Sequence, residues 1–230
     1  MSATQRSVAW RKDDGYYANE RPDLVAMLPR PLGQVLDVGC GAGTVGRQLR
    51  SEGAASLVGI EPDREAAAAA GGVYDQIMAT TVEEALNDLA GPFDTVLCYD
   101  VLEHLVDPWS VLRRLHAVAA PGGHLQVSVP NARHLSLAWD LFVRGTFGYT
   151  ERGGHRDNTH LRWFTRRDLV TSVTDAGWDV VAVGHSPLSA PRRLLERLTL
   201  GRSSEFLVFQ WYVLATRSGR GGMRLGSVQA

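Results

Sequence analysis

Two hydrophobic patterns alternate along most of the chain. Short continuous apolar stretches are followed by longer stretches in which apolar residues recur every three or four positions. The first pattern predicts buried strands, the second predicts amphipathic helices, and their alternation is typical of a mostly parallel sheet with helices on both faces. The predicted strands are residues 35–39, 56–60, 74–79, 93–100, 124–129, 178–184 and 205–216. The predicted helices are residues 45–51, 64–70, 82–90, 109–119 and 167–176, each closed by a nearby Gly or Pro.

Two segments interrupt this alternation. Residues 131–165 are rich in Arg, His and aromatic side chains and follow the fifth predicted strand. Open α/β sheets bind ligands beyond the carboxyl ends of their strands, so we predict that this segment is an inserted cap over the substrate. A short basic helix is expected within residues 191–201. The main domain is predicted to span residues 35–217, and residues 218–230, rich in Gly, Ser and Arg, are expected to form a mobile tail.

Composition and charge exclude several classes of protein. The 230 residues are 44% hydrophobic and 21% charged, which is typical of a globular domain. The net charge of −1 gives no sign of a nucleic-acid partner. No stretch approaches the roughly 20 apolar residues of a membrane helix, and no signal peptide is evident, so we expect no membrane association. Two cysteines, Cys40 and Cys98, cannot form a disulfide framework or a zinc site, which favours a cytoplasmic location.

The glycine-rich segment 35–43 is predicted to be a buried strand that feeds a tight turn and opens a helix. Such a turn lets a ligand approach backbone amides closely. Asp37 lies near the end of the strand, where a carboxylate is costly to bury unless it meets a cation or several hydrogen-bond donors. This indicates a positive or donor-rich ligand; the alternative is that Asp37 accepts a hydrogen bond within the fold.

Two cofactors compete for this loop. Residues 41–46 match the dinucleotide-binding fingerprint, and Glu61 follows the second predicted strand, where an acid that binds a ribose belongs. Asp37 and Gly39 precede the fingerprint, however, and a pyrophosphate would meet a carboxylate there. A ligand with a ribose and a cationic end, S-adenosylmethionine, therefore fits better than NAD(P).

Several ordered motifs make the chain resemble the class I S-adenosylmethionine-dependent methyltransferases, across about residues 16–216. The motifs are residues 35–43, Gly59-Ile60-Glu61-Pro62, the stretch from Phe93-Asp94 through Asp100-Val101-Leu102-Glu103-His104-Leu105, and Pro121-Gly122-Gly123. Residues 128–131 and 157–165 resemble a bacterial small-molecule subgroup. The resemblance implies a Rossmann-like α/β fold with a seven-stranded, mostly parallel sheet, an antiparallel last strand and the inserted cap after strand 5.

The resemblance also implies which residues bind the cofactor. Glu61 would hold the ribose hydroxyls, and the N-terminal segment 1–34 would fold over the cofactor, unless Tyr16, Tyr17 and Arg21 only pack on the surface. Thr81 stands where the family often has an acid facing the adenine. The methionine end would be lined by Gly39, Cys40, Gly41 and Asp100. The remaining cofactor positions are Tyr17, Arg21, Asp37, Gly43, Pro62, Val82, Val101 and Leu102.

Methyl transfer from a sulfonium is a direct displacement that requires alignment of the reactants, and we expect no metal. A hydroxyl acceptor has to lose its proton, and histidine is the natural base near neutral pH. The candidate bases are His155 and His160 in the cap and His104 after the fourth strand. Alternatively, the cap histidines hold the cap together, and His104 serves the fold.

The cap also suggests the acceptor. Its arginines favour an anionic acceptor, and its aromatic residues could stack on a sugar or a ring. Methylation of nucleic acid is less favoured, because no Asn-Pro-Pro-Tyr-type motif follows the fourth strand. We therefore predict methyl transfer to an O or N atom of a small-molecule, sugar-bearing or natural-product-like acceptor. An NAD(P)-dependent oxidoreductase and a non-catalytic cofactor-binding partner remain alternatives, and a homodimer is left open. The cap arginines, counting those directly beside the segment, are Arg133, Arg144, Arg152, Arg156, Arg162, Arg166 and Arg167.

Overall fold

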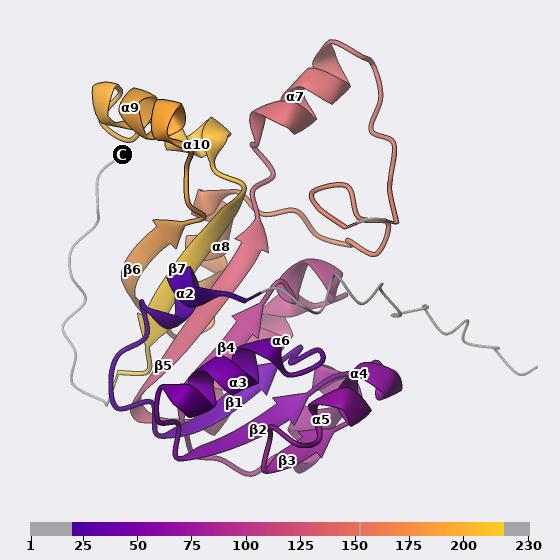
Figure 1. The fold of residues 1–230 in the computed structure, drawn as a ribbon, viewed down its shortest axis with the longest axis vertical. Helices are drawn as coiled ribbons and strands as arrows, with labels where there is room; N and C mark the ends of the chain where they lie inside the picture. Colours follow the sequence, from indigo (N-terminus) through magenta and orange to yellow (C-terminus); the bar gives the residue numbers. More distant parts are fainter. Residues whose placement is uncertain (1–19, 152, 219–230) are drawn as a thin grey trace, which may run out of the picture.

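A computed structural model describes residues 20–151 and 153–218. Within them, seven strands form one sheet in the order β3-β2-β1-β4-β5-β7-β6, which confirms the predicted architecture (Figure 1). The sheet is parallel from β3 to β5, and β7 lies antiparallel between β5 and β6. The strands are β1 (Gln34–Val38), β2 (Ser56–Ile60), β3 (Gln76–Met78), β4 (Phe93–Tyr99), β5 (Ala119–Pro130), β6 (Asp179–His185) and β7 (Gln210–Thr216).

Several helices start at polar residues whose side chains cap the first turn. The Asp63 carboxylate accepts hydrogen bonds from two backbone N–H groups of α4, and Thr165 and Asp168 form a reciprocal capping box on α8. None of the described helices is long and apolar enough to cross a membrane. The helices are α2 (Pro22–Val25), α3 (Thr44–Ser51), α4 (Arg64–Ala70), α5 (Val82–Asp88), the 3-10 helix η1 (Leu102–His104), α6 (Pro108–Val118), α7 (Leu135–Phe142), α8 (Arg166–Asp175), α9 (Ala190–Leu198) and α10 (Ser204–Leu207).

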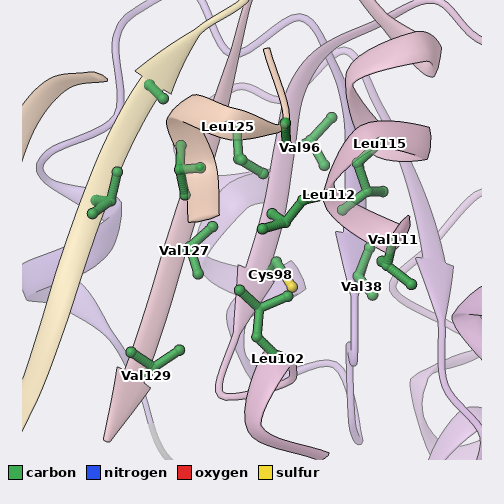
Figure 2. Packing of buried hydrophobic residues seen from close by; sticks show 14 of the residues in the cluster. Val38, Val96, Cys98, Leu102, Val111, Leu112, Leu115, Leu125, Val127 and Val129 are labelled. Carbon is green, nitrogen blue, oxygen red and sulfur yellow. The ribbon is translucent and has the colours of Figure 1, made fainter. Parts of the chain in front are cut away.

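The alternation of side chains along β1 and β4 creates a core on each face of the sheet. One core contains side chains of α5, α6 and α8, and Figure 2 shows how the apolar residues of α6 pack toward β4 and β5. The opposite core contains side chains of α2, α3 and α4. Leu102 of η1 is fully buried in the first core, so η1 is fixed at the carboxyl end of β4.

Several local predictions differ from the structure, and β5 begins at Ala119 rather than at residue 124. The predicted strand 205–216 begins only at Gln210, because α10 precedes it and the Asn131 side-chain amide donates to the carbonyls of Glu205 and Val208. Tyr74 lies before β3 rather than in it. The cap contains a helix, α7, that the pattern did not indicate; in Figure 1 it projects beyond the end of β5.

The predicted short basic helix within residues 191–201 is present as α9. Most of segment 1–34 and nearly all of the predicted tail lie outside the described residues.

Candidate functional site

A cavity of about 1040 Å³ opens at the carboxyl ends of β1, β2 and β4, where the sequence places its ligand. Of the predicted cofactor residues, Gly43 and Leu102 do not line it: Gly43 lies against Ala70 and Val73, and Leu102 is buried in the core. Tyr17 lies outside the described residues, as does Tyr16. The predicted residues that line the cavity are Arg21, Asp37, Gly39, Cys40, Gly41, Glu61, Pro62, Thr81, Val82, Asp100 and Val101.

The glycine-rich loop after β1 is held close to the end of β2. The backbone N–H groups of Gly39 and Cys40 both donate to the carbonyl of Ile60, over 2.8 and 3.1 Å. Gly39 has a φ of +74°, and a Cβ there would lie 2.5 Å from Cγ2 of Val101. Only glycine fits this position without strain.

Glu61 connects the same loop to the end of β2. Its Oε2 accepts the N–H of Gly41, and its Oε1 accepts the N–H of Asp63, both over 2.9 Å. The side chain is 5% exposed; burial raises its pKa, while these two hydrogen bonds act in the opposite direction. Each carboxylate oxygen retains capacity for a further donor, as a ribose hydroxyl would be.

Asp37 accepts a hydrogen bond within the fold, which was the alternative interpretation of this residue. The Tyr74 hydroxyl donates to its Oδ2 over 2.5 Å. Burial raises the pKa of Asp37 to about 7, although the Tyr74 hydrogen bond lowers it. Asp37 also lines the cavity, so it is a carboxyl group that changes its charge near neutral pH at the base of the site.

Asp100 is a carboxylate of the cavity that accepts three side-chain hydrogen bonds. Its Oδ2 accepts from Nη1 of Arg21 over 2.7 Å, and its Oδ1 accepts from Ser128 Oγ and Gln210 Nε2 over 2.9 and 2.7 Å. Arg21 also donates to Gln210 Oε1 over 3.0 Å. Asp100 has a φ of +55°, rare for a residue other than glycine. Gln210 lies 110 positions away, and no sequence signal indicated it.

Thr81, which the family resemblance assigns to the adenine, and Val82 line the cavity. The Thr81 hydroxyl accepts the N–H of Glu84 over 3.3 Å and so caps α5. Glu83 and Glu84 line the cavity as well. Acidic side chains are therefore present beside the position at which the sequence lacks the family's acid.

The opposite wall is formed by η1 and the end of the cap. His104 and His160 both line the cavity, with ring centroids 4.8 Å apart. The cap is fixed there because the N–H groups of Leu161 and Arg162 donate to the carbonyl of Glu103 over 2.7 and 3.0 Å. Glu103 also lines the cavity. The sequence pattern indicated a role for its neighbour His104 but gave no signal for Glu103.

His155 is not among the described residues that line the cavity. Its ring stacks on His134 with centroids 4.7 Å apart, and its Nε2 lies 3.0 Å from the carbonyl oxygen of Phe209. Burial lowers the pKa of His155 to about 4. The imidazole is therefore neutral near pH 7, and its Nε2–H donates to Phe209.

Most cap arginines are engaged elsewhere. Arg144 and Arg156 each lie 3.2 Å from a carboxylate oxygen of Asp140, while Arg133 and Arg166 pair with Glu205. Among the described residues that line the cavity, Arg21 is the only arginine. The acidic lining residues are Asp37, Glu61, Glu83, Glu84, Asp100, Glu103, Glu151 and Asp157. The described lining is therefore acidic, and it does not support the expectation of an anionic acceptor.

Comparisons with known proteins agree with this geometry. A family model described as a methyltransferase domain matches residues 9–183. The ubiquinone biosynthesis O-methyltransferase of Pseudomonas paraeruginosa is 37% identical over 171 residues, covering 70% of this chain and 72% of that protein.

Two solved structures share the fold. A SAM-dependent methyltransferase from Archaeoglobus fulgidus has a TM-score of 0.62 at 16% identity, covering 81% of this chain and 87% of the other. Magnesium protoporphyrin IX methyltransferase from Synechocystis PCC 6803, solved with bound SAH, has a TM-score of 0.55 at 19% identity, with coverages of 82% and 76%.

Proposed function

Because this chain belongs to the methyltransferase-domain family and is an S-adenosylmethionine-dependent methyltransferase, we propose that it methylates a hydroxyl oxygen of a small-molecule acceptor. Family membership decides against the NAD(P)-dependent oxidoreductase and the non-catalytic binding protein that the glycine-rich loop alone left open. The curated relative is named an O-methyltransferase, which supports oxygen over nitrogen.

The cofactor is proposed to lie along the glycine-rich loop. Glu61 would accept hydrogen bonds from the ribose hydroxyls, and Thr81 and Val82 would border the adenine. The methionine end would lie near Gly41 and Asp100. The acidic lining suits a cofactor whose sulfonium carries a positive charge.

The observation that carries the choice of a hydroxyl is the pair of imidazoles on the opposite wall. His104 Nδ1 lies 3.2 Å from the carbonyl oxygen of Thr159, so Nδ1 carries the proton and Nε2 carries the lone pair. His160 stands beside it at a centroid distance of 4.8 Å. This wall would promote loss of the hydroxyl proton while the oxygen attacks the methyl carbon. As the new carbon–oxygen bond forms, the carbon–sulfur bond breaks, and its electron pair stays on sulfur.

The acceptor is proposed to be neutral. A sugar-bearing or natural-product-like molecule with a free hydroxyl would meet acidic side chains and imidazoles in the cavity. An anionic acceptor is not part of this proposal, because the described lining offers a single arginine, which already pairs with Asp100.

The test is a methyl-transfer assay with ¹³C-methyl S-adenosylmethionine on matched sets of hydroxyl and amine acceptors. We expect product methyl signals at the chemical shift of a methoxy group. We also expect His104→Gln and His160→Gln each to reduce the single-turnover rate, whereas His185→Gln, outside the cavity, should not. Methylation of amines alone would contradict the proposal, and so would unchanged rates in both variants.

A further inference from the structure

The Glu103 carboxylate is buried without a hydrogen-bond partner. The residue is 1% exposed, and neither Oε1 nor Oε2 has a partner among the described residues. Burial, with the nearby Asp100 charge, raises its pKa well above the usual value. An unsatisfied buried carboxyl group is expensive, so a native structure retains one only where something else compensates for it. Glu103 lines the cavity, where a ligand could supply that compensation.

Two histidines are held beside this carboxyl group by a chain of hydrogen bonds. Asp157 Oδ1 accepts the N–H and the hydroxyl of Thr159, over 2.9 and 2.7 Å. The Thr159 carbonyl in turn accepts Nδ1–H of His104 and leaves the lone pair on Nε2. A carbonyl behind a histidine is the usual support of a metal-bound imidazole, because it fixes the tautomer and orients the ring.

The backbone then brings His160 to the same place. The carbonyl of Glu103 accepts the N–H groups of Leu161 and Arg162, so the residue before them is held against η1. One ligand atom each from Glu103, His104 and His160 lies within 4.8 Å of the others. Atoms bonded to one ion at about 2.0–2.2 Å stand roughly 3–4 Å apart, so small side-chain rotations would complete the set.

We propose that Glu103, His104 and His160 bind one divalent cation on the wall of the cavity, with coordination positions left open toward the acceptor. One carboxylate and two imidazoles suit ions such as Zn²⁺, Mn²⁺, Fe²⁺ or Co²⁺ better than Ca²⁺ or Mg²⁺, which prefer oxygen ligands throughout. This ligand set replaces the expectation from the sequence that the protein has no metal site.

The role of the ion rests on the proposed function. An acceptor oxygen bound in an open position would be placed beside the cofactor, and its hydroxyl would lose a proton to water more readily. The oxygen would then take the methyl carbon from sulfur as described above. In this arrangement the two histidines act as ligands rather than as bases.

Co²⁺ is a suitable ion for the test, because its visible absorption reports bound imidazole and carboxylate ligands directly. The protein, treated with a chelator and dialysed, is titrated with Co²⁺ alone. We expect a saturable spectrum at one equivalent per chain. Glu103→Gln and His160→Gln should each weaken Co²⁺ binding by at least about 10- to 100-fold. Calorimetry with S-adenosylhomocysteine shows whether each variant is folded. If Glu103→Gln does not fold, the Co²⁺ affinity of His160→Gln decides the test.

The matched control is His185→Gln, since His185 also lies 2.9 Å from a carboxylate, that of Glu196, but is not among the described residues that line the cavity. It should bind Co²⁺ as the unaltered protein does. Absence of a Co²⁺ spectrum, or equal affinity in a folded Glu103→Gln or His160→Gln variant, would overturn the site. If the chelated protein then kept full turnover, the proposed O-methylation would still hold, with the histidines acting as bases. Co²⁺ binding without turnover on any hydroxyl would contradict the proposed function and leave the metal site intact.

Discussion

The two walls of the cavity are built from different kinds of contact. The wall beneath the proposed cofactor is made by loops that end β1 and β2, and its key bond joins Gly41 to Glu61, 20 positions apart. The opposite wall joins η1 to the cap, across 55 positions between His104 and Thr159, and beside it Asp100, at the end of β4, bonds to Gln210 of β7 across 110 positions. The first wall follows directly from the parallel sheet, whereas the second depends on tertiary packing. Substitutions in the first wall should therefore act on binding and stability, and substitutions in the second on turnover.

The largest effect is expected at the cap. His160→Gln should reduce turnover about 10²- to 10⁴-fold, the range expected when loss of the hydroxyl proton is no longer assisted, while affinity for S-adenosylmethionine stays near that of the unaltered protein. Single-turnover kinetics and calorimetry measure the two quantities separately. A parallel loss of cofactor affinity would show that the walls are not independent.

Asp37 should make the first wall sensitive to pH. Its folded pKa, about 7, lies above the unfolded value of 3.8, so the folded state binds more protons than the unfolded state between those values. The stability that Asp37 contributes is complete below about pH 4 and is lost as the pH rises to 7. The loss is at most about 4 kcal/mol.

Asp37→Asn removes this titration and keeps an acceptor for Tyr74. The unfolding free energy of the cofactor-free variant, measured by urea denaturation from pH 4 to 8, should therefore vary less with pH than that of the unaltered protein. Identical pH profiles would mean that Asp37 does not titrate near neutral pH.

Glu61→Ala should weaken S-adenosylmethionine binding, because the ribose hydroxyls lose a charged acceptor and the N–H groups of Gly41 and Asp63 lose theirs. The expected loss is roughly 1.5 to 3 kcal/mol, or about 10- to 150-fold in dissociation constant by calorimetry. Glu61→Gln keeps one acceptor oxygen, so its dissociation constant should lie between those of the unaltered protein and Glu61→Ala. An unchanged constant in Glu61→Ala would remove Glu61 from the cofactor site.

The smallest effect is expected at Gly39. Gly39→Ala should lower stability by about 1 to 2 kcal/mol from the positive φ alone, with a further loss from the contact with Val101. Adding Val101→Ala should restore only the stability lost through the contact with Val101. Melting curves of the single and double variants, with Val101→Ala as the reference, separate the two costs; full recovery would show that the backbone is not strained.

The succession of strands and helices along the chain and the glycine-rich loop could be predicted because they follow from local hydrophobicity and turn chemistry, whereas the antiparallel last strand was implied by the family resemblance. The apolar run 206–209 led to a strand prediction that starts too early. Its first two residues belong to α10, whose Glu205 carbonyl accepts a hydrogen bond from the side chain of Asn131, far away in the sequence. α7 was missed because Trp139 and Phe142 are 58% and 82% exposed, so its apolar side chains do not mark a buried face.

The site shows the same division. Asp37 was noticed as a costly buried carboxylate, but its partner Tyr74 could not be identified, because the two are 37 positions apart. His104 and His160 were selected by residue type, whereas the part of Glu103 became visible only with its burial and its missing partners. The cap arginines pointed to an anion by composition, and their pairing with Asp140 and Glu205 could not be read from the sequence.

The position of β7 between β5 and β6 has a consequence for synthesis on the ribosome. The strand that pairs with both β5 and β6 is β7, which is complete only when the chain has been made beyond Thr216. Gln210 at the start of β7 can then bond to Asp100. The amino-terminal strands can pair while translation continues. The clamp on Asp100 closes only with the last strand, so a chain released early would have the cofactor loop without a finished site.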